Sequence, residues 1–523
     1  MSTAVEPTSQ PGSTDGVHTI SQSIGSLSLD ADSQRVERQL GNTETSYFLP
    51  SRESGVNDMY LHLGCRAPAH LFQRTLVRLT WAILRVRHPL LASRVEMHDY
   101  EDIRFVYNVP SSPEEALARA EESLEYRKGT KDELLDSYLN GPRTLSNSRL
   151  SYLIVSEPPS EGNEDTQNHD ILICTTHFLG DGMALHQFAN HFFNLLASKT
   201  EVELKDLLQQ EWETRCKASH GQSVLPASLE DRLPKESQVG FKRIAERIDF
   251  QLSQDKLIGG HAFPRRSGQA RRTIVPTIPF DEERTKKILK NCKEHGVSIS
   301  AATFALCSIA WARTNNLKWE LPTMMYSALN LRPQLVTTPA INDSYWFIAI
   351  GYFNVVLPAF LPKSTQDVSA TFWQRARSAK EQSTDAAKNK RLVSRSREMA
   401  AKRAKQARVW AKEDDDKANS VWKAPPPAPK KDTGPPRPPS NALIGLSLLG
   451  NLDGIYKHAT FSEIKLHTLT TGSRQRQGGM LMFGYTFVGK LWISLGYDEN
   501  GFDKDVVDKF WHHVLAGVDE FLG

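Results

Sequence analysis

The segment from residue 169 to residue 198 constrains the fold of this chain more than any other segment. It opens with HDILICTTHF (169–178), an apolar and β-branched run that predicts a buried strand. The run ends at LGDG (179–182), and MALHQFANHFFNLLAS (183–198) then carries apolar residues at helical spacing. A strand that passes through a glycine turn into a helix sets that turn at a sheet edge, facing a crevice. The junction therefore predicts an α/β protein and marks the turn as a candidate site.

Strands and helices are predicted along the rest of the chain as well. Apolar or alternating runs predict strands at 58–65, 90–97, 149–157, 320–333, 344–360, 441–453, 478–489 and 490–498. Helical spacing or composition predicts helices at 69–87, 281–295, 298–315, 383–411 and 503–522. We therefore expect mixed sheets flanked by helices, in α+β layers.

The length of the chain predicts two lobes. Single cores stop growing near about 250–300 residues, and this chain has 523. Its composition divides it into a disordered polar tail at 1–45, a first lobe at 46–200, a polar crossover at 201–271, and a second lobe at 272–523 that contains a basic, proline-rich insert at 383–440.

Positive charge is concentrated in this insert. Residues 380–440 hold sixteen Lys or Arg and eight Asp or Glu, whereas the rest of the chain holds 48 basic and 53 acidic residues. The net charge of +3 therefore gives no reason to expect a nucleic-acid partner. The basic run 388–412 could bind an acidic partner or an anionic membrane, but its thin apolar face favours a solvated insert. The prolines at 423–440 favour a polyproline-type linker.

Other features argue against several classes of protein. No apolar run is long enough to span a bilayer, and the first forty residues lack the pattern of a secretory or mitochondrial leader. The five cysteines are few, odd in number and widely spaced, which argues against a disulfide framework and against a zinc site. We therefore expect a protein of a reducing compartment, the cytosol, with no bound metal.

The candidate site is THFLGDGM (176–183), which contains an H-x-x-x-D-G pattern. His177 is the candidate general base, because imidazole is neutral near pH 7 and can take a proton from a hydroxyl group. Asp181 is expected to act structurally, since a buried carboxylate needs a partner. Arg332, in a strand predicted to be buried, is the candidate partner, and such a pair would fix the turn and the His177 ring. Gly182 would allow a close backbone approach and begin the helix.

Each of these residues also has a plainer interpretation. His177 could be a core histidine bonded to a backbone carbonyl, Asp181 a helix N-cap, and Arg332 a surface residue at a strand end. Cys174 could act as a nucleophile with His177, but side chains alternate along a strand and would point apart, so a buried thiol is expected. We expect only surface or packing roles for two histidines of the following helix, His186 and His191.

On these residues, the sequence resembles the coenzyme-A-dependent acyltransferase superfamily, which includes chloramphenicol acetyltransferase, plant BAHD acyltransferases and condensation domains. THFLGDG is similar to the motif of that superfamily, and the likeness covers about residues 35–523 apart from the insert. The other segments that carry it are HPLLASRV (88–95), HGVSISAATFALCSIAWAR (295–313), NLRP (330–333), GYFNVVLP (351–358), SLLGNLD (447–453) and GKLWISLGYD (489–498). The fungal trichothecene 15-O-acetyltransferase type is the most similar branch.

The resemblance implies two chloramphenicol-acetyltransferase-like lobes with a tunnel between them, in which acyl donor and acceptor meet at His177. It implies an O-acyltransferase that moves an acetyl or other short acyl group from acyl-CoA, a co-substrate, to a hydroxyl of a secondary metabolite. Transfer would be direct, within a ternary complex and without a permanently bound cofactor, and Arg332 would meet Asp181. The developing oxyanion needs a donor, and Ser447, on a strand expected near the tunnel, is our candidate. We expect a monomer, because the two lobes bury each other.

Two alternatives to this function stay open. One is transfer from a carrier-protein thioester, or amide formation as in condensation domains. Those domains carry His where this chain has Thr176, and no carrier-attachment motif is present; the D-F-G-W-G motif of plant enzymes is also missing. The other alternative is a non-catalytic scaffold of the same fold that binds a metabolite.

Overall fold

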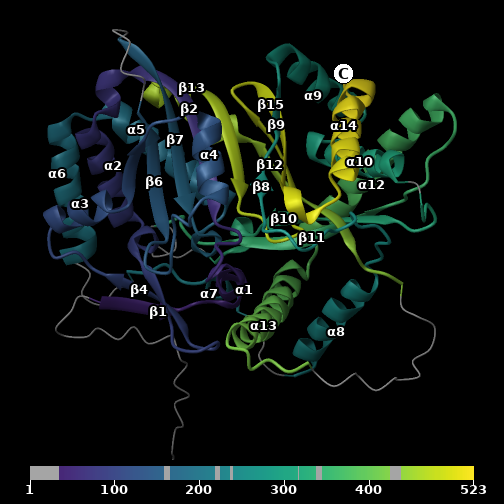
Figure 1. Ribbon diagram of the computed structural model, residues 1–523, viewed down its shortest axis with the longest axis horizontal. Coiled ribbons are helices and arrows are strands. Elements are labelled where there is room, and N and C mark those ends of the chain that lie inside the picture. The colour runs from purple at the N-terminus through teal and green to yellow at the C-terminus, as the bar shows by residue number, and fades with distance from the viewer. Residues whose placement is uncertain are drawn as a thin grey trace, which may run out of the picture.

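Figure 1 shows the computed structural model of the chain, which describes residues 35–157, 165–217, 224–235, 240–315, 317–336, 344–424 and 438–523. Two large mixed sheets stand side by side, one built mainly from the first half of the chain and one from the second, and helices cover both. A small third sheet lies beside the first. The predicted fold class, mixed sheets flanked by helices in two lobes, is confirmed.

The first large sheet has five strands in the order β13-β2-β7-β6-β5. Only the pair β5–β6 is parallel. In this register Thr175, the last residue of β7, stands opposite Met59 on β2 and Ser151 on β6. The strands are β2 (Met59–Pro68), β5 (Leu124–Arg127), β6 (Ser151–Ser156), β7 (Thr166–Thr175) and β13 (Lys465–Ser473).

Side chains of β7 alternate between two packed faces of this sheet. Ile171 and Ile173 belong to the large core beneath helices α2 (Arg74–Arg87) and α5 (Gly182–Ser198). Leu172 and Cys174 belong to a smaller cluster on the other face, with Tyr138 of α4 (Lys131–Asn140). Helices α3 (Pro113–Glu121) and α6 (Glu201–Trp212) complete the outer layer beside α2. Since both faces are covered, the end of β7 is rigidly placed.

The second large sheet follows the order β11-β10-β12-β14-β15-β8, with β9 also paired to β15. Its central strands β10, β12 and β14 are parallel. Its strands are β8 (Thr273–Ile274), β9 (Thr277–Phe280), β10 (Thr323–Asn330), β11 (Ile350–Leu357), β12 (Ala442–Asn451), β14 (Met480–Phe487) and β15 (Lys490–Asp498). One face packs under α9 (Glu282–Glu294), α10 (Ile299–Thr314), α12 (Thr365–Ala387) and α14 (Lys504–Phe521).

The opposite face of this second sheet joins the core of the first half. Met482 on β14 belongs to the cluster under α10 and α14, whereas its neighbour Phe483 belongs to the large core of the first half. Tyr485 and Trp492 also belong to that core. The two halves therefore share one apolar interior along their contact.

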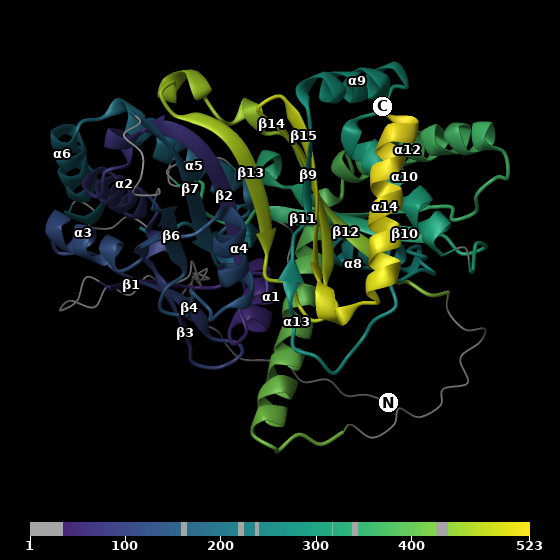
Figure 2. The same ribbon diagram turned by 45° about the horizontal axis from the view of Figure 1, so that its top comes forward.

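Strand β13 crosses between the halves. It comes from the C-terminal part of the chain, yet it forms the edge of the first sheet, where Thr470 pairs with His62 of β2. Figure 2 shows β13 between the two halves, next to β2. The predicted second lobe at 272–523 did not include this exchange, because KLHTLTTGS (465–473) mixes threonines, a histidine and a glycine and was not recognised as a strand.

The predicted tail at 1–45 ends too late. Residues Arg35–Gln39 form β1, which pairs with β4 (Ile103–Asn108) in the small sheet β1-β4-β3, where β3 is Arg94–Met97. Helix α1 follows at Asn42–Ser51. Val36 and Leu40 are buried, and the polar residues around them concealed this short element in the sequence. Residues 1–34 lie outside the described part of the chain.

The segment predicted as a crossover, 201–271, contains helices. Besides α6 it forms α7 (Leu229–Arg232) and α8 (Phe241–Asp255). Helix α6 packs on α2 of the first half, whereas α8 packs on α13 (Leu392–Ala418) from the insert. The crossover thus contributes to the outer layers of both halves.

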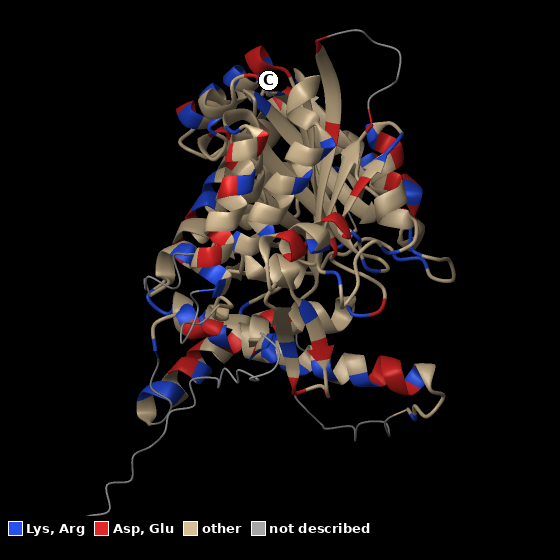
Figure 3. Cartoon of the chain, turned by 90° about the vertical axis from the view of Figure 1, so that its left-hand side faces the viewer, with Lys and Arg blue, Asp and Glu red and all other residues tan. Residues whose placement is uncertain are grey.

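The basic insert is helical, as predicted, but one of its faces is not solvated. Helix α13 packs along α1 and α8, as Figure 1 shows below the second sheet. Its buried face consists of small residues, Ser394, Ala400, Ala404, Ala407 and Ala411, which allow a close approach of the backbones. Figure 3 shows Lys and Arg interspersed with Asp and Glu over the helices of this side. The proline-rich residues 425–437 lie outside the described residues.

Candidate active site

His177 lies at the contact between the halves, two residues after β7 ends. It opens a short 3₁₀ turn, His177–Leu179, before α5 begins at Gly182. Phe178 and Leu179 in this turn are almost fully buried and hold it in the core, whereas the His177 side chain is half-buried. The predicted strand–turn–helix junction is confirmed.

The hydrogen bond of His177 fixes which ring nitrogen carries the proton. Its Nδ1 lies 3.1 Å from the carbonyl oxygen of Gly180. A carbonyl oxygen only accepts, so Nδ1 is the donor, and the neutral ring has its free lone pair on Nε2. Burial lowers the pKa of His177 below its ordinary value, outweighing Asp181 and two backbone groups that raise the pKa. The ring is therefore a neutral base at pH 7.

Asp181 acts both as a helix cap and as an ion-pair partner. Its Oδ1 accepts from the backbone nitrogens of Met183 at 3.1 Å and Ala184 at 3.2 Å, at the N-terminus of α5. Its Oδ2 lies 2.6 Å from Nη1 of Arg332 and accepts from the nitrogen of Ala349 at 2.9 Å. Asp181 is thus both the N-cap of α5 and the ion-pair partner of Arg332, so both interpretations of this residue are correct. Both oxygens of its buried carboxylate have partners.

Arg332 ties two other segments to the turn. It follows β10 by two residues, in a 3₁₀ turn, rather than lying inside the strand as predicted. Its Nη2 donates to the carbonyl oxygens of Tyr345 at 3.2 Å and Phe347 at 3.1 Å. Its side chain is only 18% exposed, which rules out an ordinary surface role. The ion pair therefore clamps the α5 turn, the end of β10 and the segment before β11.

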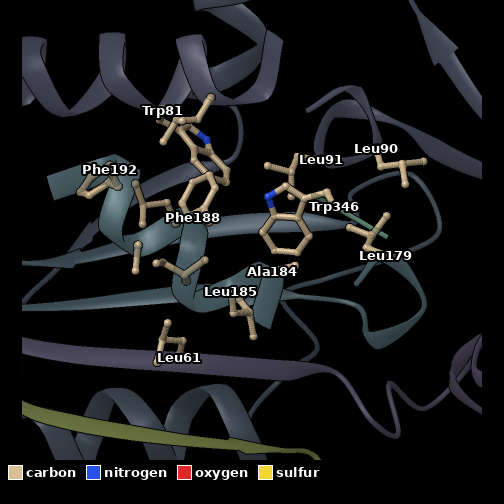
Figure 4. Close-up of a cluster of buried hydrophobic side chains, with 14 of the residues drawn as sticks. Leu61, Trp81, Leu90, Leu91, Leu179, Ala184, Leu185, Phe188, Phe192 and Trp346 are labelled. Carbon is tan, nitrogen blue, oxygen red and sulfur yellow. The ribbon is translucent and has the colours of Figure 1, made fainter. Parts of the chain in front are cut away.

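Two glycines let neighbouring segments approach this turn. A Cβ added at Gly180 would lie 2.8 Å from Cε3 of Trp346, whose indole is fully buried. Figure 4 shows Trp346 packed beside Leu179, above the first turn of α5. At Gly182, which begins α5 as predicted, an added Cβ would meet Cδ2 of Leu449 on β12 at 3.2 Å. Of these two glycines, Gly180 is thus the one more closely approached, because the rigid ring of Trp346 fills the space beside it.

A pair of tyrosines and an arginine adjoin His177, and the sequence analysis did not find them. The ring of Tyr47 on α1 lies 4.4 Å from the His177 ring, centre to centre. Its hydroxyl contacts the hydroxyl of Tyr352 on β11. The guanidinium carbon of Arg403 on α13 lies 5.2 Å from the Tyr47 ring centre and 4.4 Å from that of Tyr352. Tyr47 was missed because α1 borders the predicted tail, and Arg403 because it lies in the supposed solvated insert.

A cavity of about 550 Å³ lies on the far side of these tyrosines. It is partly open, and residues of α1, α8, β11, α12 and α13 line it. Tyr352 and Arg403 line it, while His177 does not. A cavity of this size suits a metabolite-sized ligand. Because His177 does not line this cavity, the cavity does not represent the predicted tunnel in which donor and acceptor meet at His177. The tunnel stays a prediction.

Ser447 lies within β12 and is half-buried. It pairs across the ladder with Phe483 of β14. Two residues further along the same strand, Leu449 reaches the start of α5 at Gly182. The strand therefore runs next to the turn, and the role of Ser447 as an oxyanion donor stays a prediction.

The other candidates have packing roles in the structure. All five cysteines are buried free thiols, and burial raises the pKa of Cys174 beyond the range of a reactive thiolate. His186 Nδ1 lies 2.9 Å from the Tyr456 hydroxyl, and His191 Nδ1 lies 3.1 Å from the Tyr345 hydroxyl. Both histidines are thus engaged away from the turn, which agrees with the roles expected for them.

The described residues contain no group of three or more His, Cys, Asp or Glu side chains placed to hold a metal ion. Among the same residues, no single helix is both long and apolar enough to cross a membrane, although α9 and α10, which meet at 92°, pass that test as a pair.

Comparison with known proteins supports the resemblance seen in the sequence. No family model matches the chain. A curated relative, O-acetyltransferase pigM from Monascus ruber, is 22% identical over 468 residues, which are 86% of this chain and 76% of the relative. This similarity extends over both halves of the fold.

Solved structures share the fold. TRI3 trichothecene 15-O-acetyltransferase from Fusarium sporotrichioides superposes with a TM-score of 0.72 at 14% identity, covering 94% of this chain and 96% of that one. The condensation domain of the Monacolin K polyketide synthase MokA gives a TM-score of 0.54 at 9% identity, covering 92% and 96% of the two chains. The predicted resemblance to acyltransferases, and to the trichothecene 15-O-acetyltransferase type in particular, is confirmed.

Proposed function

We propose that this chain is an O-acyltransferase that moves an acetyl or other short acyl group from acyl-CoA to a hydroxyl of a secondary metabolite. The similarity to two enzymes named O-acetyltransferases supports the reaction class. The donor, the acceptor and the role of each residue below are part of the proposal.

One observation carries the mechanism: the hydrogen bond from His177 Nδ1 to the Gly180 carbonyl oxygen, 3.1 Å long. It leaves Nε2 as the basic nitrogen, and burial keeps the ring neutral. The Asp181–Arg332 ion pair lies at the residue that follows Gly180 and holds that carbonyl in place. The neutral ring is therefore a base held in one orientation before substrate binds.

The proposed reaction is a single acyl transfer. The acceptor hydroxyl gives its proton to Nε2 of His177 as its oxygen attacks the thioester carbonyl carbon. A carbon–oxygen bond forms, the carbon–sulfur bond breaks, and the proton passes from Nε2 to the leaving thiolate. CoA leaves as a thiol, the acceptor as an ester, and His177 is neutral again. A placed histidine of this kind contributes about 10²–10⁴-fold to the rate.

Negative charge develops on the thioester oxygen during the attack and needs a hydrogen-bond donor. We propose Ser447 for this role, supported by its place on β12, the strand whose Leu449 contacts the Gly182 position. Removal of one such donor lowers the rate by about 10²–10³-fold in enzymes where it has been measured. Ser447→Ala is therefore expected to lower kcat and to leave folding unchanged.

The chain is further proposed to act as a monomer in a reducing compartment such as the cytosol, without a resident metal or cofactor. The state of the cysteines supports the compartment, since all five are free thiols. The small molecules that it would meet there are acyl-CoA and the alcohol.

The test compares thioester consumption by the wild-type chain, His177→Ala and His512→Ala. His512 is exposed on α14 and serves as the matched histidine control. Thiol release is measured with acetyl-CoA and a panel of hydroxylated metabolites, and folding is measured by circular dichroism. We expect His177→Ala to be folded and slower by at least about 10²-fold. A folded His177→Ala variant with undiminished turnover would remove the general-base role.

The same assay separates the alternatives. Acyl-carrier protein replaces acetyl-CoA in a parallel series, and an amine panel replaces the alcohols. Structural similarity to a condensation domain is the observation that supports this second candidate function, transfer from a carrier protein or amide formation. Turnover only with the carrier protein, or only with amines, would favour it. Metabolite binding without thioester loss in any arm would favour the non-catalytic scaffold.

A further inference from the structure

The cavity lined by Tyr352 contains an arginine whose charge has no carboxylate partner among the described residues. Arg403 of α13 lines this cavity. No Asp or Glu of the described chain forms an ion pair with it, and the charged or titratable groups that affect its pKa are Tyr47 and Tyr352. Its guanidinium lies over both rings.

The other arginine of the cavity is different. Arg395, two turns earlier on α13, is paired with Asp249 of α8 through Nε at 2.7 Å. Asp249 also pairs with Arg391 at 2.8 Å. The positive charge of Arg395 is thus compensated by the protein itself, whereas that of Arg403 is not. This contrast on one helix points to a ligand at Arg403.

The tyrosines do not neutralise Arg403. A phenol is uncharged at neutral pH, and burial raises the pKa of Tyr47 further above its ordinary value. Contact with aromatic rings attracts a guanidinium but leaves its charge in place. Arg403 is half-buried and charged, and no carboxylate is in contact with it, so an anion that enters the cavity gains from pairing with it.

The walls of the cavity are largely apolar. Phe250 and Leu252 of α8, Leu329 of β10, and Leu392 and Met399 of the insert contribute to them. Among the charged lining residues, Arg403, Lys256 and Asp385 form no ion pair within the described chain, whereas Arg395 and Asp249 pair with each other. The lining therefore has one positive charge in excess and suits an amphipathic acid, which has an apolar body and one oxyanion.

We propose that this cavity binds the acceptor alcohol through a carboxylate or similar oxyanion of that alcohol, which pairs with Arg403. The inference rests on the proposed acyl transfer for the role of the ligand as acceptor. The ring of Tyr47 adjoins both Arg403 and His177, so one metabolite can span the two groups. Tyr352 lines the cavity, and its hydroxyl contacts the hydroxyl of Tyr47, whose ring adjoins the imidazole. In this proposal the bound acceptor displaces the contact between the two hydroxyl groups.

The test uses matched acids and amides. Medium-chain ω-hydroxy fatty acids, hydroxyoctanoate and hydroxydecanoate, and their neutral amides are titrated into the full chain by calorimetry. Arg403→Gln removes the charge and Arg403→Lys keeps it. Lys405→Gln removes an exposed charge from the same helix and is the control. Folding of each variant is checked by thermal unfolding.

We expect the wild-type chain to bind the acids roughly ten- to a hundredfold more tightly than the amides, as for a hydrogen bond to a charged group. Arg403→Gln should abolish this preference, whereas Arg403→Lys should keep part of it and Lys405→Gln all of it. Equal binding of acids and amides by the wild-type chain, or a preference that survives in Arg403→Gln, would overturn the inference.

Two further arms separate the inference from its premise. Titration of CoA alone tests the other source of an oxyanion: if Arg403→Gln weakens CoA and not the hydroxy acids, Arg403 serves the donor and the inference is wrong. Thiol release from acetyl-CoA is then measured with each hydroxy acid. The wild-type chain could bind the acids selectively, lose this selectivity in Arg403→Gln, and yet release no thiol. That result would support the anion site and would contradict only the proposed acyl transfer.

Discussion

Asp181 and Arg332 are 151 residues apart in the sequence, yet Oδ2 of the first lies 2.6 Å from Nη1 of the second. Asp181 belongs to the turn that follows the first sheet, and Arg332 to the end of a strand in the second. The pair therefore joins the two halves next to Gly180, whose carbonyl oxygen is bonded to the ring of the proposed base. This relation, predicted from the sequence, is also the most direct target for substitution.

Replacement of Asp181 by Asn should destabilise the protein by about 3 kcal/mol, because it leaves the guanidinium of Arg332 without its counter-charge. Asparagine keeps an oxygen to cap α5, so the loss reports the contacts of Oδ2, namely the ion pair with Arg332 and the hydrogen bond from the Ala349 nitrogen. The free energy of unfolding in urea measures it. Glu121→Gln, which breaks an exposed pair with Arg78, is the control and should cost less than about 1 kcal/mol. Equal losses of unfolding free energy in the two variants would mean that the buried ion pair contributes no more to stability than the exposed one.

The acid limb of the rate profile should lie below pH 6.5. Burial lowers the pKa of His177 from its ordinary value of 6.5, so the ring stays neutral, and active as a base, through a wider acidic range than a free histidine. As pH falls through this lowered pKa, the ring gains a proton and kcat/KM should fall. The pH dependence of thiol release measures the midpoint. A midpoint at or above the ordinary value would contradict the burial argument.

His169 should make the folded state sensitive to acid. Its ring is buried against Phe72 at 4.1 Å, and burial lowers its pKa from 6.5 to about 4. Between these two values the unfolded chain binds a proton that the folded chain does not, so stability falls as pH falls, by up to about 1.4 kcal/mol per unit. His169→Phe should remove this part of the slope, since neither ring nitrogen has a hydrogen-bond partner among the described residues. Unfolding in urea at several pH values tests it; an unchanged slope would refute it.

Gly180→Ala should be more damaging than Gly182→Ala. The new methyl at 180 would lie 2.8 Å from the buried indole of Trp346, which cannot yield, whereas at 182 it would meet a flexible leucine at 3.2 Å. We expect the first change to cost about 1–3 kcal/mol and to lower kcat by moving the carbonyl that orients His177. The second should cost little. Thermal unfolding and thiol release compare them; similar losses would show that the ring contact does not matter.

The small residues of α13 should be needed for its packing. Ala404 is fully buried on the face toward α1, and Ala404→Leu should cost about 1–3 kcal/mol by forcing the helices apart. Ala401 is exposed on the same helix, and Ala401→Leu is the matched control. The midpoint of thermal unfolding measures both changes. If Ala404→Leu were as harmless as its control, the insert would be loosely held.

The sequence predicted the site well where chemistry and periodicity coincide. His177, Asp181 and Arg332 were found because a strand, a glycine turn and a helix follow one another, and because a buried carboxylate requires a cation. Most long strands and helices of the second half were found for the same reason, namely a sustained apolar period.

The sequence could not reveal groups that meet only in three dimensions. Tyr47, Tyr352 and Arg403 lie far apart along the chain and share no motif. A helix whose buried face is alanine also has a weak hydrophobic signal, so α13 was interpreted as solvated. Such a face packs by close approach rather than by large side chains, and periodicity scales do not register it.

The exchange of β13 has a consequence for synthesis on the ribosome. Strand β2 offers one edge to β7 and the other to β13, which is made about four hundred residues later. Until Lys465–Ser473 have left the ribosomal exit tunnel, the nascent first sheet keeps an open edge that can pair with other chains. About four hundred further residues must therefore be translated before the sheet that is made first is complete, and chaperones have a long interval in which to protect it.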